Sequence, residues 1–222
     1  MRKITYLILF GCLCLFQSCF EVVEQLVFKD DGSGSFQLLV NMSKSKTKLN
    51  SIRKMKTVNG HDVPTKEEIS SKVKELENAI KNTAGITNVK TALDFDNYIA
   101  SISCNFSKVN NLNLAARNVA KLDNGNDKVL EDAYQYDPGK KIFSRMNKFF
   151  VKEDYRKMSN ADKEIFATAN YTGIFRFDSE VAGTSNKESK VSANKKAVML
   201  KLNALDVLSQ KRSIENNINL VK

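Results

Sequence analysis

The sequence predicts an α+β fold, with a mainly antiparallel sheet and two or three helices packed on it. Three observations lead to this prediction. Several segments alternate apolar and polar residues with a period of two, others carry apolar residues at helical spacing, and turn signals separate neighbouring segments. Two strand–turn–strand units, each followed by a helix, precede a strand-rich C-terminal part, and this order is typical of α+β proteins.

The first strand–turn–strand unit opens the predicted domain. Residues 20–28 have a strand-like composition, residues 30–34 are a strong turn signal, and apolar side chains alternate over residues 36–42. This pattern predicts a β-hairpin. The basic segment 43–56 carries apolar residues on one helical face, so we predict a helix there, interrupted by the turn signal at residues 59–60.

A capping box marks the start of the clearest helix. Thr65 is followed three residues later by Glu68, so each side chain can bond the backbone N–H of the other residue. An apolar stripe at helical spacing follows, and Gly85 provides the stop signal. The stripe consists of Ile69, Val73, Leu76 and Ile80.

The second strand–turn–strand unit follows this helix directly. We predict strands at residues 86–93 and 98–106, joined by a turn at residues 94–97. Ser107 can cap a further helix, and residues 123–127 are predicted to form a loop.

Residues 128–165 give the least regular pattern in the chain. A turn is predicted at residues 137–139, a strand at residues 142–151 and a short helix at residues 159–166. We treat residues 19–222 as a single α+β domain, and the sequence leaves open whether residues 128–165 are an insertion within it.

The C-terminal part is rich in predicted strands. A long alternation of apolar residues is followed by three shorter apolar segments, with one helical turn among them. The predicted strands are residues 167–177, 191–193, 197–202 and 214–220, and the helical turn is residues 206–210.

The N-terminus has the features of a signal peptide. Two basic residues, Arg2 and Lys3, are followed by an apolar run over residues 4–16. A bilayer-spanning helix needs about 20 apolar residues, so this run is too short to serve as one. We therefore predict a signal peptide over residues 1–18. No later apolar run approaches membrane length.

The residues before Cys19 indicate the kind of cleavage. The segment Leu-Phe-Gln-Ser-Cys at residues 15–19 resembles the bacterial lipobox, in which a small residue precedes the cysteine that becomes lipidated. Phe16 and Gln17 depart from the strict pattern, as in the relaxed lipoboxes of Bacteroidota-type bacteria. The resemblance implies acyl chains such as palmitate on Cys19, and therefore stable membrane anchoring. A rival lipobox ending at Cys12 and an unlipidated N-terminus stay open.

Cysteine usage agrees with lipidation. Removal of the signal peptide eliminates Cys12 and Cys14, and lipidation consumes Cys19. Cys104 is then the remaining cysteine, so an intramolecular disulfide cannot form. A free thiol survives an oxidising compartment best when it is buried, and Cys104 lies on the apolar alternation of residues 98–106.

The order of these signals also resembles a known group of proteins. The segments that carry the resemblance are residues 19–24, 31–34, 85–86, 94–98 and 106–107. This order resembles a family of uncharacterised Bacteroidota lipoproteins and is more distantly similar to the mycobacterial LppM-type lipoprotein domain. The resemblance covers residues 1–120 and, more loosely, residues 167–222. It implies an envelope location and an α+β domain, and it brings no catalytic residues.

The sequence contains no complete set of catalytic or metal-binding residues, so we predict no catalytic, metal or cofactor site. His61 is the single histidine, whereas zinc sites use three or four ligands. The turn at residues 30–34 lacks the ligands of a calcium loop, and neither a nucleophile elbow nor a phosphate loop is present. We therefore expect that the protein is not an enzyme. A glycan hydrolase stays open, because its carboxylate pair leaves no local pattern.

Basic residues crowd two segments of the chain. The formal charge is +10, and without residues 1–18 the 33 basic and 25 acidic residues leave +8. An exported chain rarely meets nucleic acid, so we exclude that partner and leave open solvated faces or contacts with anionic lipid or glycan. The candidate contacts are Lys44, Lys46, Lys48, Arg53, Lys54, Lys140, Lys141, Arg145 and Lys148.

These observations predict a membrane-anchored cell-envelope lipoprotein, non-enzymatic, with a binding or structural role. Its predicted partners are the membrane, through lipid on Cys19, and another envelope protein or an anionic lipid or glycan. Phe20 rather than Asp follows Cys19, and a strongly acidic surface-export signal is missing, which favours the outer membrane and its periplasmic side. A lipoprotein that binds a lipid or small molecule, and an envelope glycan hydrolase, are the alternatives.

Overall fold

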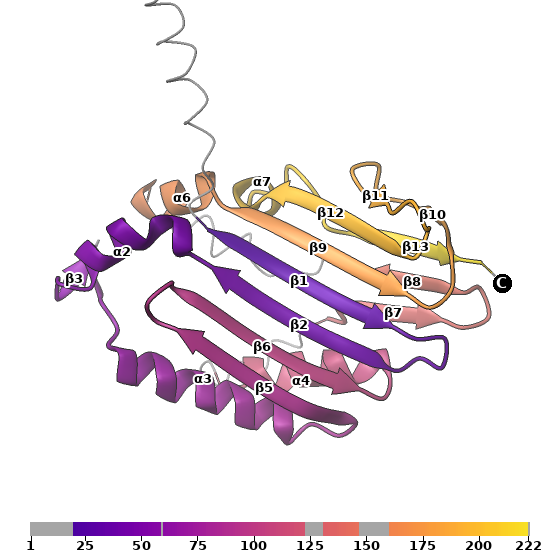
Figure 1. The fold of residues 1–222 in the computed structure, drawn as a ribbon, viewed down its shortest axis with the longest axis horizontal. Coiled ribbons are helices and arrows are strands. Elements are labelled where there is room, and N and C mark those ends of the chain that lie inside the picture. Colours follow the sequence, from indigo (N-terminus) through magenta and orange to yellow (C-terminus); the bar gives the residue numbers. More distant parts are fainter. Residues whose placement is uncertain (1–19, 59, 123–130, 147–159, 222) are drawn as a thin grey trace, which may run out of the picture.

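The computed structural model describes residues 20–58, 60–122, 131–146 and 160–221 (Figure 1), without the side chains of residues 161, 162, 164 and 165. The predicted signal peptide, the predicted lipidation site Cys19, the predicted loop at residues 123–127 and Lys148 lie outside these residues. Within the described ranges, no helix is both long and apolar enough to cross a membrane. A chain that begins at Phe20 retains every described strand and helix.

Seven strands form the main sheet, in the order β11-β12-β9-β1-β2-β6-β5 (Figure 1). Their bounds are β1 (Glu21–Phe28), β2 (Gly34–Asn41), β5 (Ile86–Asp94), β6 (Ile99–Phe106), β9 (Asn170–Phe177), β11 (Lys190–Val191) and β12 (Ala197–Asn203). β1 and β9 pair in parallel, and the other neighbouring pairs are antiparallel. The predicted fold class is therefore confirmed.

A four-stranded second sheet packs on one face of the main sheet. It has the order β10-β13-β8-β7 and consists of β7 (Tyr134–Asp137), β8 (Ile142–Arg145), β10 (Val181–Thr184) and β13 (Asn216–Leu220). The ring of Phe143 lies 5.4 Å from that of Phe28 and 5.9 Å from that of Phe175, and all three rings are buried. Each such ring contributes about 2–3 kcal/mol on burial, so these contacts hold the two sheets together.

Two helices, α3 (Lys66–Lys81) and α4 (Val109–Ala120), cover the β5–β6 side of the main sheet (Figure 1). The predicted capping box is confirmed. Thr65 Oγ1 accepts a hydrogen bond from the Glu68 backbone N–H at 3.1 Å, and Glu68 Oε2 accepts one from the Thr65 backbone N–H at 2.7 Å. Leu112 and Ala115 of α4 belong to the same core cluster as Phe143, so the helices and the second sheet share one core.

The shorter elements gather mostly at the end of the main sheet where β1 begins (Figure 1). They are η1 (Ser43–Ser45), α2 (Lys46–Ile52), β3 (Thr57–Val58), β4 (His61–Asp62), α6 (Asn160–Ala167) and α7 (Ala204–Leu208). This end therefore combines the start of β1 with the basic segment that was predicted to be helical.

Several predicted boundaries need correction. The helix predicted over residues 43–56 ends at Ile52, because the chain then turns into the β3–β4 hairpin. The strand predicted at residues 142–151 ends at Arg145 within the described range, and the strand predicted from residue 167 starts at Asn170 because α6 extends to Ala167. β7 and β10 were not predicted. Whether residues 128–165 are an insertion stays a prediction, although β8 supplies core residues.

Candidate functional site

The chain is fixed in place from its first described residue. The carbonyl of Phe20 accepts a hydrogen bond from the backbone N–H of Asn170 at 3.0 Å, and its ring packs against Phe166 at a centroid distance of 5.6 Å. Glu21 forms an ion pair with Lys201 at 3.5 Å. These contacts attach the start of β1 to β9, β12 and α6, so Phe20 has a defined position at this end of the sheet.

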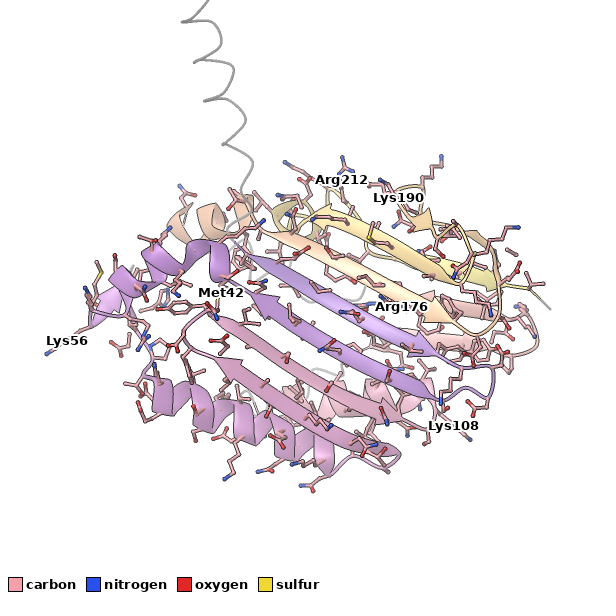
Figure 2. All side chains as sticks on the ribbon, in the orientation of Figure 1. Met42, Lys56, Lys108, Arg176, Lys190 and Arg212 are labelled. Atoms are coloured by element: carbon pink, nitrogen blue, oxygen red, sulfur yellow. The ribbon has the colours of Figure 1, made fainter. Side chains whose placement is uncertain are left out.

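The first basic cluster begins beside Phe20, with Lys44. Phe20, Glu21, Lys44 and Lys201 are among the residues that line a cavity of about 40 Å³. Residues 43–56 contain six basic and no acidic side chains, and all six are exposed. Figure 2 shows Lys56, the last of the six, at one extreme of the molecule. The structure thus brings together five of the predicted contacts: Lys44, Lys46, Lys48, Arg53 and Lys54.

An apolar pocket of about 200 Å³ lies between α2, the start of α3 and the turn that joins β5 to β6. Its lining is apolar apart from the Tyr98 hydroxyl and the side chains of Arg53, Lys66 and Asp94. The apolar part includes Leu49, Ile52, Val63, Ile69, Leu93 and Ala100. Each of these six side chains keeps partial exposure, whereas a close-packed core would bury them. The pocket is therefore an open apolar hollow.

Tyr98 ties α2 to the main sheet beside this pocket. Its hydroxyl donates a hydrogen bond to Asn50 Oδ1 at 2.6 Å and accepts one from Arg53 Nη1 at 3.5 Å. The Tyr98 backbone has a φ of +56°, and its carbonyl accepts a bond from the Met42 N–H at 2.9 Å. These contacts place the exposed guanidinium of Arg53 at the mouth of the pocket.

The other charges around the pocket have partners. Lys66 Nζ lies 5.2 Å from the centre of the Phe95 ring, a cation–π distance. Asp94 accepts hydrogen bonds from the side chain of Asn97 at 2.8 Å and from two backbone N–H groups of its own turn. The bond from the Asn97 side chain is the largest cause that lowers the pKa of Asp94. Asp94 is therefore ionised and held by its turn, and the two cations and this one carboxylate give the lining a net charge of +1.

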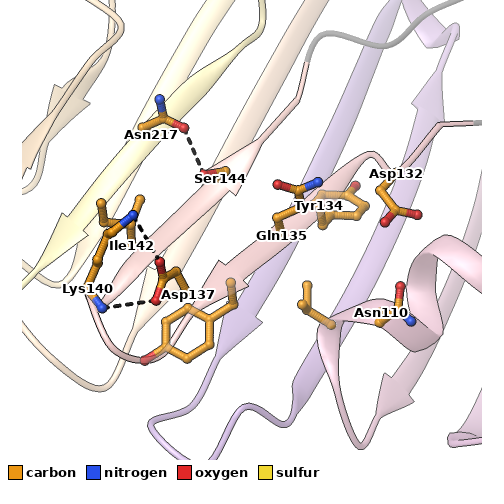
Figure 3. A pocket seen from close by; sticks show the side chains of 11 residues that line it. Asn110, Asp132, Tyr134, Gln135, Asp137, Lys140, Ile142, Ser144 and Asn217 are labelled. Carbon is orange, nitrogen blue, oxygen red and sulfur yellow. Dashed lines mark hydrogen bonds and ion pairs between the residues drawn. The ribbon is translucent and has the colours of Figure 1, made fainter.

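The described members of the second basic cluster do not share one surface, because Arg145 is buried while Lys140 and Lys141 lie in a turn. Lys140 and Lys141 lie in the β7–β8 turn, at the end of the main sheet where β1 finishes, because Tyr136 packs against Phe28 at a ring distance of 4.6 Å. Figure 3 shows Lys140 beside Asp137, with Nζ 3.6 Å from Oδ2. These lysines lie at the opposite end of the sheet from α2.

An open groove of about 510 Å³ runs over β7, β8 and the start of α4 (Figure 3). Its two carboxylates are engaged, since Asp132 pairs with Arg117 at 2.7 Å and Asp137 accepts the Lys140 backbone N–H at 3.0 Å. The bond from the Lys140 N–H is the main cause that lowers the pKa of Asp137. A lowered pKa makes Asp137 a poor choice for the protonated acid that glycoside cleavage requires.

Arg145 was predicted to contact an anionic surface, and this prediction is wrong. Its relative exposure is 4%, and its Nε and Nη2 atoms donate hydrogen bonds to the two carboxylate oxygens of Glu24 at 2.8 and 2.9 Å. Nη1 donates to the Met146 carbonyl at 2.7 Å, and the Tyr171 hydroxyl donates to Glu24 at 3.1 Å. This bidentate pair joins β8 to β1 through the core.

Burial dominates the electrostatics of this cluster. Burial alone would lower the pKa of Arg145, but the charge of Glu24, together with Tyr134 and Tyr171, outweighs it and the pKa rises. Burial, and then the charge of Glu24, raise the pKa values of both tyrosines. The guanidinium stays charged and the phenols stay neutral. Within the described part of the chain, no buried side-chain N or O atom lacks a hydrogen-bond partner. We interpret the cluster as structural.

Metal and thiol chemistry find little support in the described residues. They contain no group of three or more histidine, cysteine or acidic side chains placed to hold a metal ion, and His61 is exposed on β4. Cys104 is 5% exposed, which confirms the prediction of a buried thiol. Burial raises the pKa of this thiol to about 11, so it is a poor nucleophile at neutral pH.

Comparisons with known proteins give one weak structural likeness. No family model and no curated protein matches the chain. The fold is similar to the NMR structure of the folded domain of LppM from Mycobacterium tuberculosis, with a TM-score of 0.42 and 13% identity over 91% of this chain and 89% of that chain. This similarity is too weak to transfer a property from one protein to the other. The resemblance to Bacteroidota lipoproteins stays a prediction.

Proposed function

We propose that this chain is a membrane-anchored cell-envelope lipoprotein, lipidated at Cys19, whose domain rests with its α2 end against the membrane surface. The observation that carries the proposal is the cavity that Phe20, the residue after Cys19, shares with Lys44 of the first basic cluster. A lipid on Cys19 and the exposed cations of residues 43–56 would therefore meet the same surface.

The tether in this arrangement is very short. Consecutive Cα atoms are about 3.8 Å apart, and Phe20 is bonded to Asn170, so an anchor on Cys19 cannot hold the domain away from the bilayer. Electrostatic attraction in physiological salt extends over about 8 Å. Lysines this close to anionic lipids gain about 1 kcal/mol each. The acyl chains would supply the anchoring, and the cations would orient the domain.

The proposed role is binding or structural rather than catalytic, at the periplasmic side of the outer membrane. The presence of Phe20 rather than Asp directly after Cys19 supports a location at the outer membrane, as predicted from the sequence. The engaged carboxylates of Asp132 and Asp137 give a glycan hydrolase little support. Another envelope protein or an anionic glycan could use the same exposed cations, and both stay within the proposal.

The anchor is tested by intact-mass analysis of the membrane fraction, with wild type beside Cys19→Ala. We expect wild type to begin at an acylated Cys19 and the variant to lack the lipid. If wild type retains residues 1–18 or carries no lipid, the lipoprotein proposal fails.

The orientation is tested separately with a chain that begins at Phe20. Its binding to vesicles of phosphatidylglycerol and phosphatidylcholine should weaken as the salt concentration rises. Replacing Lys44, Lys46 and Lys48 by Gln should reduce the affinity for these vesicles by up to about 100-fold. The matched control replaces Lys140, Lys195 and Lys196, which lie in turns at the opposite end of the main sheet. Equal loss in both triple variants would refute the orientation but leave the anchor standing.

A further inference from the structure

We infer that the pocket under α2 binds an anionic amphiphile, with its alkyl chain among the apolar side chains and its anionic head at Arg53. This inference goes beyond membrane anchoring, because the pocket lies wholly within the described domain and needs no lipid on Cys19. It therefore stands or falls independently of the proposed function.

The shape of the pocket fits an alkyl chain. A space of about 200 Å³ separates α2 from α3 and the β5–β6 turn, and apolar side chains reach it from each of these elements. Leu49 and Ile52 come from α2, Ile69 from α3, and Leu93 and Ala100 from the sheet. None of these side chains is fully buried, so an alkyl chain would remove further apolar surface from water.

The pocket is built into the fold rather than being a gap between loose segments. The bond from the Tyr98 hydroxyl to Asn50 Oδ1 holds α2 over the space, and the capping box of Thr65 and Glu68 fixes the start of α3 on the other side. A preformed apolar space with a few placed polar groups is the usual form of a ligand pocket.

Charge complementarity selects the head group. Arg53 lies at the mouth with its guanidinium near the Tyr98 hydroxyl, and the flanking segment 43–56 carries no acidic residue. Asp94 is the one carboxylate of the lining, and its oxygens accept hydrogen bonds from its own turn. The two cations and one carboxylate of the lining leave a net charge of +1, which favours an anionic head over a cationic one.

The test is titration calorimetry of the chain that begins at Phe20 with octanoate, decanoate and dodecanoate below their micelle concentrations. We expect saturable binding of one molecule per chain. Affinity should rise about fourfold for each added methylene, from about 0.8 kcal/mol per buried CH₂, and then level off when the pocket is full. Binding that does not saturate, or affinity that is independent of chain length, would overturn the inference.

Matched variants locate the site. Arg53→Gln should weaken decanoate binding about two- to fivefold and leave decanol binding unchanged, while Lys54→Gln, an exposed neighbour outside the pocket, should change neither. Ile52→Phe and Ala100→Leu fill the pocket from opposite sides and should each abolish binding, and Met55→Phe is the surface control. Circular dichroism and melting temperature show which variants fold. Folded filling variants that bind decanoate like wild type would contradict the assignment.

A second experiment distinguishes the two possible sources of the amphiphile, a membrane lipid and a free single-chain molecule. The same chain is incubated with phosphatidylglycerol vesicles, recovered by flotation and analysed by native mass spectrometry. A retained lipid that Ile52→Phe eliminates identifies a membrane lipid as a ligand. Binding of decanoate without lipid retention identifies a free single-chain amphiphile instead.

Discussion

Replacing Glu24 by glutamine should destabilise the domain far more than the small change in shape suggests. The two carboxylate oxygens of Glu24 accept hydrogen bonds from Arg145 at 2.8 and 2.9 Å, and both residues are 4% exposed. The substitution leaves a buried guanidinium without its counter-charge. Removing one partner of a buried pair costs about 3–5 kcal/mol, a large part of the 5–15 kcal/mol that holds a domain folded.

The measurement is a guanidinium chloride unfolding curve for the chain that begins at Phe20, in wild type, Glu24→Gln, Arg145→Met and the double variant. Each single variant should lose about 3–5 kcal/mol, and the double variant should lose clearly less than the sum, because it leaves no uncompensated charge. Glu75→Gln is the control. Its pair with Lys72 is exposed at both ends, so the change should stay within about 0.5 kcal/mol.

One result would refute this reasoning directly. If Glu24→Gln stays within about 1 kcal/mol of wild type, Arg145 must find solvent or another partner, and the pair does not join the sheets as described. Additive losses in the double variant would show that the two side chains act separately.

Four further predictions concern other parts of the fold. Cys104 should react with iodoacetamide at pH 8 about 100-fold more slowly in the folded than in the unfolded chain, because burial raises its pKa from 9.0 to about 11. The same pKa shift should make the free energy of unfolding fall as pH rises from about 9 to 11, because the folded state keeps a proton that the unfolded chain loses. Urea titrations across this pH range measure the change. A rise in the free energy of unfolding would contradict the pKa shift. Thr65→Ala should cost about 1 kcal/mol by removing the cap of α3, measured as a lower denaturation midpoint, whereas Thr57→Ala in exposed β3 should cost less. Gly85→Ala should lower the free energy of unfolding by about 1–3 kcal/mol, because Gly85 has a φ of +76° and the new Cβ would lie 2.5 Å from the Asn111 side chain. An unchanged melting temperature would show that this turn relaxes freely.

Local signals predicted the local structure well. The turn at residues 30–34 and the capping box at Thr65 specify their conformations within a few residues, and both are confirmed. The parallel pairing of β1 with β9 joins segments far apart in the chain, and such a contact leaves no local pattern. β10, with the sequence Val-Ala-Gly-Thr, is too short and too weakly alternating to be recognised as a strand.

The candidate site was predicted only in part for a similar reason. Five basic residues of the first cluster lie within one short stretch of chain, so closeness in sequence became closeness in space. The apolar pocket draws its lining from α2, α3, β5 and β6, and the helical stripe of α3 gave no sign that α2 would stay separated from it. A pocket between elements depends on how they pack, which spacing within one element does not specify.

Strand alternation, applied strictly, contains the signal that the charge-based prediction missed. Side chains two residues apart on a strand point to the same face, so Arg145 must share its face with Phe143, which is fully buried. The same rule places Glu24 on the buried face of β1, together with Leu26 and Phe28. A buried cation requires a buried anion, and these two positions each break an apolar alternation with a charge of opposite sign. Reading such exceptions along a strand moves Arg145 from the surface to the core, and the hydrogen bonds from Arg145 to Glu24 in the structure then identify β1 as the strand that it faces.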